Sequence, residues 1–216
     1  SSGEVLFSTF AEEHANLTLP DGTKVTMNSN SSLTYSPKDF NRDERCVDFN
    51  GEAYFNVAKN KSVPFVITTK DLTVRVLGTK FNLHAYAGNE TMEVTLEEGE
   101  ILVSSRKEEK KLLPNQKAVL NCQDGSILVL EEKRPEDASV WKNNELVFID
   151  EQLENVIVAL EENYNISIHI KGLNIDSDLF TGKVPSNDLL NALEILKYSY
   201  HMDYCVDAKD IYFSKK

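Results

Sequence analysis

The sequence is poor in cysteine. Its three cysteines form no CxxC pair and are too few and too scattered for a disulfide framework. We expect Cys46, Cys122 and Cys205 to be small buried hydrophobic side chains. One disulfide, between Cys46 and Cys122, stays an alternative in an oxidising compartment.

Long hydrophobic runs are also missing. None approaches the roughly 20 residues that span a bilayer, and the first residues lack the basic and apolar segments of a signal peptide. The sequence has no initiator Met. We therefore expect a segment of a longer protein, such as the part of a membrane-anchored protein that lies outside the bilayer.

Positive charge is scarce. The chain of 216 residues has 23 Lys and Arg against 35 Asp and Glu, which gives a formal net charge of −12. Because contact with phosphate requires a basic field, this balance disfavours a nucleic-acid-binding protein. It also disfavours docking on an anionic membrane surface.

Catalytic and metal-binding motifs are missing from the sequence. It contains no HExxH, EF-hand loop, GxSxG, Walker A loop or GxGxxG. The four histidines are isolated, whereas a metal site needs three or four converging ligands. Glu97, Glu98 and Glu100 are more typical of a solvated turn than of an acid/base pair. We therefore predict that the protein is not an enzyme and holds no metal or cofactor.

What the sequence does contain is period-two alternation, strongest between Gly51 and Tyr86. Alternation of this kind predicts strands that bury one face. Asn50-Gly51 is typical of a hairpin turn, and at Gly78 we expect a bend or bulge, where a β-carbon is unfavourable if φ is positive. The alternating runs lie at 53–57, 65–68, 72–77 and 81–86.

Short strands separated by turns about every 8–12 residues continue to residue 130, which predicts a mainly β domain at 1–132, a sandwich, barrel or solenoid. The charged segment that follows is typical of a linker, which we place at 133–142. It contains Pro135 and Trp141, the only Trp. We interpret Trp141 as a packing anchor between domains.

After the linker the period changes from two to helical spacing. We predict a small α+β domain at 143–216, with the order β-α-β-β-α-β-β and two helices on one face of a single small sheet. Asp150 and Ser186 are the expected helix caps, because their side chains accept hydrogen bonds from free backbone N–H groups.

Several segments of the β domain resemble the FecR family, the regulatory proteins of bacterial ferric-siderophore cell-surface signalling. The segments are LPDGTKVTMNSNSSLTY (Leu19–Tyr35), FNGEAYFNVAKNKSVPFVI (Phe49–Ile67), VRVLGTKFNLHAY (Val74–Tyr86), VTLEEGEILVS (Val94–Ser104) and LLPNQKAVL (Leu112–Leu120). Trp141–Ile168 and Phe180–Ser199 resemble the small C-terminal domain often fused to FecR. That domain is similar to the STN module at the N-termini of secretins and TonB-dependent transducers.

The resemblance implies a function that the residues alone do not. Family members cross the inner membrane once, and a short cytoplasmic domain holds an extracytoplasmic-function (ECF) sigma factor. The periplasmic part receives a signal from the N-terminal signalling domain of an outer-membrane TonB-dependent transporter. By resemblance, this chain is the periplasmic sensor region of such an anti-sigma factor, without the transmembrane helix and the cytoplasmic domain.

A receiver of a protein signal needs accessible surface, and an exposed sheet edge can accept a partner strand. We place the candidate edges at Ile166–Lys171 and in the final hairpin, Tyr204–Phe213. The candidate partner-binding residues are Ile166, Ile168, Ile170, Tyr204, Val206, Ile211 and Phe213.

Two other functions stay open at this point. An extracytoplasmic glycan-binding β protein is one, because Tyr35, Tyr54 and Tyr86 form a candidate stacking platform on outward strand positions. A structural component of the cell envelope without a switching role is the other.

Overall fold

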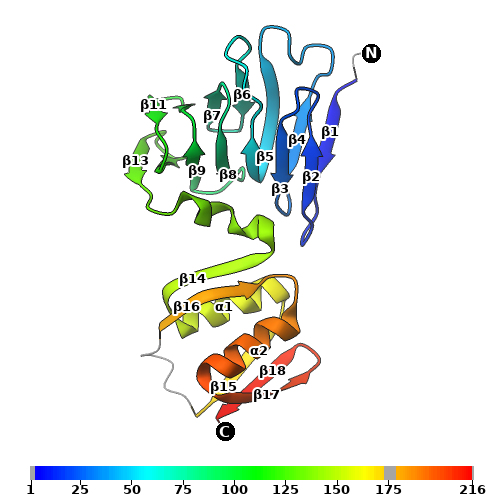
Figure 1. Ribbon diagram of the computed structural model, residues 1–216, viewed down its shortest axis with the longest axis vertical. Coiled ribbons are helices and arrows are strands. Elements are labelled where there is room, and N and C mark those ends of the chain that lie inside the picture. The colour runs from blue at the N-terminus through cyan, green and yellow to red at the C-terminus, as the bar shows by residue number, and fades with distance from the viewer. Residues whose placement is uncertain (1–2, 173–178, 216) are drawn as a thin grey trace. The chain divides into compact units, whose positions relative to one another are not determined.

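The chain forms two units of different composition in the computed structural model, which describes residues 3–172 and 179–215. Unit 1 is Ser1–Lys142 and unit 2 is Asn143–Lys216. Figure 1 shows that unit 1 is built mainly from strands, whereas unit 2 combines strands with helices.

Among its described residues, unit 1 contains thirteen strands, which belong to one large sheet. The strands are β1 (Val5–Ser8), β2 (Ala15–Thr18), β3 (Lys24–Met27), β4 (Ser32–Tyr35), β5 (Arg45–Asn56), β6 (Phe65–Thr68), β7 (Thr73–Val76), β8 (Lys80–Ala85), β9 (Thr91–Glu98), β10 (Ile101–Ser104), β11 (Glu109–Leu112), β12 (Gln116–Asn121) and β13 (Ile127–Glu131). The main order is β11-β10-β7-β6-β5-β8-β9-β12-β13. Because β11 also contacts β12 and β13, the sheet nearly closes on itself. A mainly β N-terminal region is therefore confirmed.

The alternating runs of the sequence form the core of unit 1, as predicted. Their inward residues are almost completely buried, and Phe55 stacks on Phe81 with ring centroids 5.3 Å apart. Offset aromatic contacts of this kind add to the stability that burial of the rings provides. One continuous hydrophobic cluster joins the two halves of the sheet.

Strand β5 is the centre of this arrangement. Its first half pairs with β4 and β6, and its second half pairs with β3 and β8. We call the first half of β5, together with β1, β4, β6, β7, β10 and β11, half-sheet A. The second half of β5, together with β2, β3, β8, β9, β12 and β13, is half-sheet B. A single strand therefore belongs to both halves.

The hairpin predicted at Asn50-Gly51 is wrong, because β5 continues through both residues. Gly51 has a φ of +123°, and a β-carbon there would lie 2.1 Å from Ser31 Oγ. Ser31 approaches because its Oγ accepts a hydrogen bond of 3.0 Å from the Glu52 N–H. Glycine therefore lets β5 pass from one half-sheet to the other while Ser31 packs against its backbone.

The bend predicted at Gly78 is confirmed, and φ at Gly78 is not positive. The chain bends at Leu77 and Gly78, and Gly78 is not among the glycines with positive φ. A β-carbon there would lie 2.7 Å from Lys59 Cα. Close approach of a neighbouring backbone, not left-handed geometry, is what requires glycine.

A buried ion pair fixes the turn around Asp21. The Arg45 side chain is fully buried, and its Nη1 lies 2.8 Å from Asp21 Oδ2. Arg45 also donates to the Ala58 carbonyl at 2.7 Å and to the Val63 carbonyl at 2.8 Å. Asp21 accepts from both the N–H and the hydroxyl of Thr23. The pair is therefore satisfied by several partners, which a buried charge requires.

Unit 2 has the element order that the sequence predicts. Its elements are β14 (Glu145–Gln152), α1 (Leu153–Tyr164), β15 (Ser167–Lys171), β16 (Leu179–Pro185), α2 (Leu189–Tyr200), β17 (Met202–Asp207) and β18 (Asp210–Lys215).

The single small sheet predicted for unit 2 is wrong. The strands form two sheets, β14-β16 and β15-β18-β17. Helix α1 contacts β14, β15 and β16, and α2 contacts β16 and β17, so the helices lie between the two sheets (Figure 1). The physical reason is that buried residues of β16 and β18 share one cluster with both helices. The helices therefore bury apolar surface against both sheets rather than against one.

The predicted helix caps are also wrong. Helix α1 starts after Gln152, which makes no side-chain cap, and Asp150 lies within β14, where its N–H donates to Thr181 Oγ1 at 2.8 Å. Helix α2 is capped by Asp188, whose side chain accepts from the Asn191 N–H. Ser186 lies three residues before Leu189, the first residue of α2, so Asp188 and not Ser186 takes the N-cap position.

All three cysteines are free, so the Cys46–Cys122 alternative is not realised. Cys46 and Cys205 are exposed and Cys122 is half-buried. The expectation that they are buried is therefore wrong, because Cys46 and Cys205 take the outward positions of their strands.

Candidate functional site

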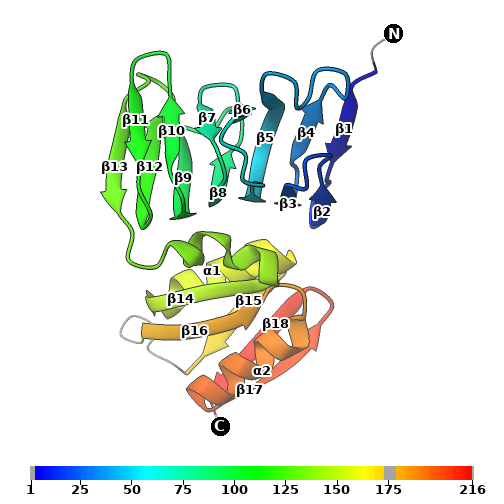
Figure 2. The same cartoon turned by 45° about the horizontal axis from the view of Figure 1, so that its top comes forward.

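The three-stranded sheet of unit 2 carries the predicted partner-binding residues. Strand β15 runs parallel to β18, and β17 runs antiparallel to β18 on its other side. Figure 2 shows the three strands next to one another. Within the part of the chain that the structure describes, β15 and β17 are each paired on one side only.

The structure brings most of the predicted residues into two rows across this sheet. Ile168, Ile211 and Val206 form one row. The other consists of Ile170, Phe213 and Tyr204. Ile166 precedes β15 and packs on the same cluster as these rows.

The structure corrects the expectation for Ile211 and Phe213. Both lie on the central strand β18, which is paired on both sides, and their exposed fractions are 0% and 1%. They belong to the core of unit 2 and offer no edge to a partner. The candidate surface is therefore reduced to the outer strands β15 and β17.

The outer strands differ in how much of each side chain reaches solvent. Ile166, Ile168 and Ile170 pack partly buried against the cluster. On β17, the Tyr204 hydroxyl donates to Glu194 Oε1 of α2 at 2.8 Å. Burial, and then the bond to Glu194, raises the pKa of the Tyr204 phenol. Val206 is 48% exposed.

The outward face of the same sheet contains a hollow of about 480 Å³ that sequence reasoning missed. His169 stacks on Tyr212 with ring centroids 4.8 Å apart, and its Nε2 lies 2.8 Å from Asp210 Oδ1. The signal was present in the alternate phase of the strands, where His169 and Tyr212 take outward positions. The lining includes His169, Lys171, Asp203, Cys205, Tyr212 and Ser214.

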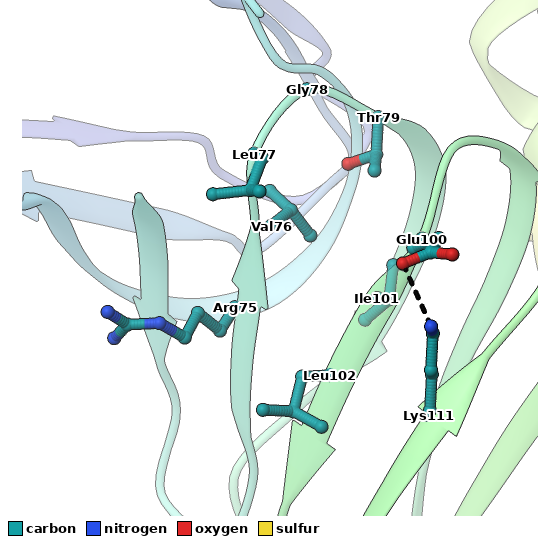
Figure 3. Close-up of a pocket in the computed structure, with 9 residues that line it drawn as sticks. All are labelled: Arg75, Val76, Leu77, Gly78, Thr79, Glu100, Ile101, Leu102 and Lys111. Carbon is teal, nitrogen blue, oxygen red and sulfur yellow. Dashed lines mark ion pairs between the residues drawn. The ribbon is translucent and has the colours of Figure 1, made fainter. Parts of the chain in front are cut away.

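Unit 1 has a separate pocket of about 390 Å³ beside the bend at Gly78 (Figure 3). Val76 and Ile101 form apolar walls, and Lys111 Nζ pairs with Glu100 Oε2 at 3.0 Å. Figure 3 shows the Arg75 side chain pointing away from that pair. The pocket offers apolar surface and one surface ion pair, and we assign it no reaction.

The three tyrosines of the candidate glycan platform make contacts within unit 1, and the Tyr35 ring lies 5.3 Å from the Phe40 ring between centroids. The Tyr54 hydroxyl donates to Glu97 Oε2 at 2.8 Å, and Lys142 Nζ lies 3.3 Å from the centroid of the Tyr54 ring. The Tyr86 hydroxyl donates to the Ser29 carbonyl at 2.7 Å. Because the Tyr54 ring already carries a cation, the structure does not favour sugar stacking there.

The segment expected to be a linker forms a 3₁₀ helix, η1 (Pro135–Asn143). Its Trp141 Nε1 donates to Asn82 Oδ1 at 3.1 Å, and the ring meets His14 edge-on at 5.6 Å between centroids. Ser139 Oγ donates to Glu97 Oε1 at 3.3 Å. These partners all belong to unit 1, so η1 is held on half-sheet B by a polar network.

No cluster of three or more candidate metal ligands occurs among residues 3–172 and 179–215. In the same residues, no helix is long and apolar enough to cross a membrane.

Comparison with known proteins supplies the family. The model of the FecR protein family matches residues 6–102, and the model of the FecR C-terminal region matches residues 145–213. No curated protein sequence matches the chain. A crystal structure of a candidate anti-sigma factor from Parabacteroides distasonis ATCC 8503, at 2.50 Å resolution, is 31% identical with a TM-score of 0.69, and the match covers 99% of each chain.

A second structure from the same organism and with the same description, at 1.65 Å resolution, is 32% identical with a TM-score of 0.69. The match covers 98% of this chain and 99% of that chain. With two family models that together match most of its length, and relatives of this identity over nearly the whole chain, the chain belongs to the FecR family of anti-sigma factors.

Proposed function

We propose that the chain is the periplasmic, signal-receiving region of a transmembrane anti-sigma factor. In this proposal, the N-terminal signalling domain of an outer-membrane TonB-dependent transporter binds the chain. A transmembrane helix and a cytoplasmic domain outside this sequence pass the signal to an ECF sigma factor. Unit 1 is then the FecR-type domain, and unit 2 is an STN-like domain.

One observation carries the proposal: unit 2 presents a three-stranded sheet whose outer strands are each paired on one side only among the described residues. Unpaired backbone N–H and C=O groups on such a strand are a template for a further strand. Strand addition provides affinity through main-chain hydrogen bonds and specificity through alternate side chains. A receiver of a protein signal needs this kind of surface and no catalytic groups.

The direct test is binding of the purified chain to the isolated N-terminal signalling domain of the transporter encoded beside it. We expect a complex with a Kd on the order of micromolar, which titration calorimetry measures. The same transporter without its N-terminal domain is the control and is expected not to bind. Absence of binding to the signalling domain contradicts the proposal.

A genetic test separates signalling from a purely structural role in the envelope. Deletion of the chain from the full-length protein should change transcription from promoters that depend on the sigma factor. Unchanged transcription, with the full-length protein normally produced, would favour the structural role.

A further inference from the structure

The hydrogen bonds of β18 identify which backbone groups face the free sides of its neighbours. The Ser167 N–H of β15 donates to the Lys209 carbonyl at 2.8 Å. Because groups alternate along a strand, Ser167 and His169 face β18, while the N–H groups of Ile168 and Ile170 point to the free side of β15.

The same alternation fixes the ladder on the other side of β18. Lys209, Ile211 and Phe213 direct backbone groups toward β15, so the residues between them pair with β17. Tyr204 and Val206 lie opposite Phe213 and Ile211. Their N–H and C=O groups therefore point to the free side of β17.

The free side of β15 is partly closed by a side chain. The Ile168 N–H donates to Glu161 Oε2 of α1 at 3.0 Å, and the Ile166 N–H donates to the Glu161 carbonyl at 3.2 Å. An added strand would have to displace a carboxylate from a charge-assisted hydrogen bond. Occupying an edge donor in this way is a known means of protecting a strand from further pairing.

No comparable closure occurs at Tyr204 and Val206 within the described part of the chain. The Tyr204 side chain is directed to Glu194 of α2, and Val206 is 48% exposed. Strand β17 thus combines open backbone groups with an exposed apolar side chain at its edge.

The charges around β17 indicate what side chains the added strand carries. Between 143 and 216, thirteen Asp and Glu stand against six Lys, with no Arg. Asp207 lies on the outward phase of β17 and is exposed, and Tyr212, which is 42% exposed, lines the hollow on the same face of the sheet. Carboxylates and an aromatic face favour cationic side chains.

We propose that the partner of unit 2 adds an extended strand to the free side of β17, not of β15, and that this strand alternates Lys or Arg with aliphatic residues. Its cationic side chains lie over the outward face near Asp207 and Tyr212, and its aliphatic side chains pack beside Val206. The inference rests on the proposed function and specifies the edge and the chemistry of the contact.

The test compares two proline variants of the whole chain. Val206→Pro removes an N–H from the free side of β17, and Ile170→Pro removes the corresponding N–H from β15, in each case without loss of a ladder hydrogen bond. Val206→Pro is expected to weaken binding of the transporter's signalling domain at least about tenfold, and Ile170→Pro less than about twofold. Circular dichroism checks that both variants fold.

Two short synthetic peptides test the chemistry, one alternating Lys with Val and one alternating Glu with Val. The wild-type chain should bind the Lys peptide at least about tenfold more tightly, and Asp207→Lys should reduce that preference. Amide hydrogen exchange on the wild-type chain gives a readout free of folding defects. Tyr204 and Val206 should gain protection when the signalling domain is added, while Ile170 should not.

The outcomes separate the inference from the proposed function. If the signalling domain binds but Ile170→Pro, not Val206→Pro, abolishes binding, the edge is β15 and the inference is overturned. If neither variant changes binding, strand addition is overturned while the proposed function stands. If the signalling domain does not bind at all, but the Lys peptide protects Tyr204 and Val206, the edge stands and the proposed function fails.

Discussion

The two units differ in what their interiors contain. Among the described residues, every buried polar or charged side chain lies in unit 1, including the fully buried Arg45. The buried residues of unit 2 are apolar, and its charged groups lie at the surface. The interior of unit 1 therefore combines an apolar core with buried polar contacts, whereas the interior of unit 2 is apolar and its polar groups lie at the surface.

The contrast has a consequence for how each unit tolerates change. Buried polar networks are costly when one member is lost, because the remaining partners stay desolvated. Apolar cores accept substitutions that preserve volume. We therefore expect the interior of unit 1 to be the less tolerant, and the surface of unit 2 to carry the specificity for a partner.

Two signals allow the units to be followed separately. Trp141 is the only Trp of the chain and makes its contacts within unit 1. Both α-helices of the described residues belong to unit 2. Fluorescence therefore reports unit 1, and the helical band in circular dichroism reports unit 2.

The largest effect is expected from Arg45→Met. The substitution leaves Asp21, whose side chain is 5% exposed, without its cationic partner, and should lower the free energy of unfolding of unit 1 by about 3–5 kcal/mol. Urea unfolding followed by Trp141 fluorescence measures it. The control is Arg75→Met, whose pair with Glu44 has side chains 43% and 37% exposed, with a change below about 1 kcal/mol. Equal losses would contradict the contrast.

Leu193→Ala tests whether apolar packing alone holds unit 2. Leu193 is completely buried on α2, and its truncation should cost about 2–5 kcal/mol. The helical signal should be lost at lower urea while the Trp141 signal keeps its midpoint. Leu190→Ala on the same helix, where Leu190 is 64% exposed, should change stability by less than about 0.5 kcal/mol. A joint shift of both signals after Leu193→Ala would show that the units do not unfold separately.

Gly51→Ala should destabilise unit 1 by about 2–3 kcal/mol, because it adds backbone strain and a steric clash. The new β-carbon meets Ser31 at a φ of +123°. At Gly88, φ is +93° but no heavy atom lies within 4 Å. Gly88→Ala should therefore cost only strain, about 1 kcal/mol. Similar losses at the two positions would refute the packing argument for Gly51.

The smallest effect concerns pH and Tyr54. Burial, followed by the hydrogen bond to Glu97, raises the pKa of the Tyr54 phenol above its ordinary 10.0. The protonated phenol therefore contributes its full stabilisation below pH 10.0. This stabilisation is lost as the pH rises from 10.0 to the pKa of the phenol in the folded state. Above pH 10.0, unit 1 should lose stability more steeply in the wild type than in Tyr54→Phe, as measured by urea midpoints. Parallel profiles would argue against this effect.

The strands of unit 1 were predictable because period-two alternation is a local property of the sequence. For example, the residues on either side of Phe55, Ile67 and Phe81 are enough to predict that these three side chains are buried. Gly51 was not predictable, since Asn-Gly is the same local signal in a hairpin and in a long strand. Only Ser31, which is twenty residues away in the sequence, decides between them.

The same limit applied to unit 2. The order of helices and strands followed from periodicity, but the pairing of β14 with β16 and of β15 with β18 depends on contacts distant in the sequence. The closure of β15 by Glu161 depends on where α1 packs. The candidate edge residues therefore included Ile211 and Phe213. Only the strand order shows that both lie on the central strand and not at an edge.

The long strand β5 has a mechanical consequence. Because β5 is a strand of both half-sheet A and half-sheet B, a force applied to either half reaches the other along the main chain of β5. We therefore expect unit 1 to resist extension as a single body, with its two half-sheets moving together.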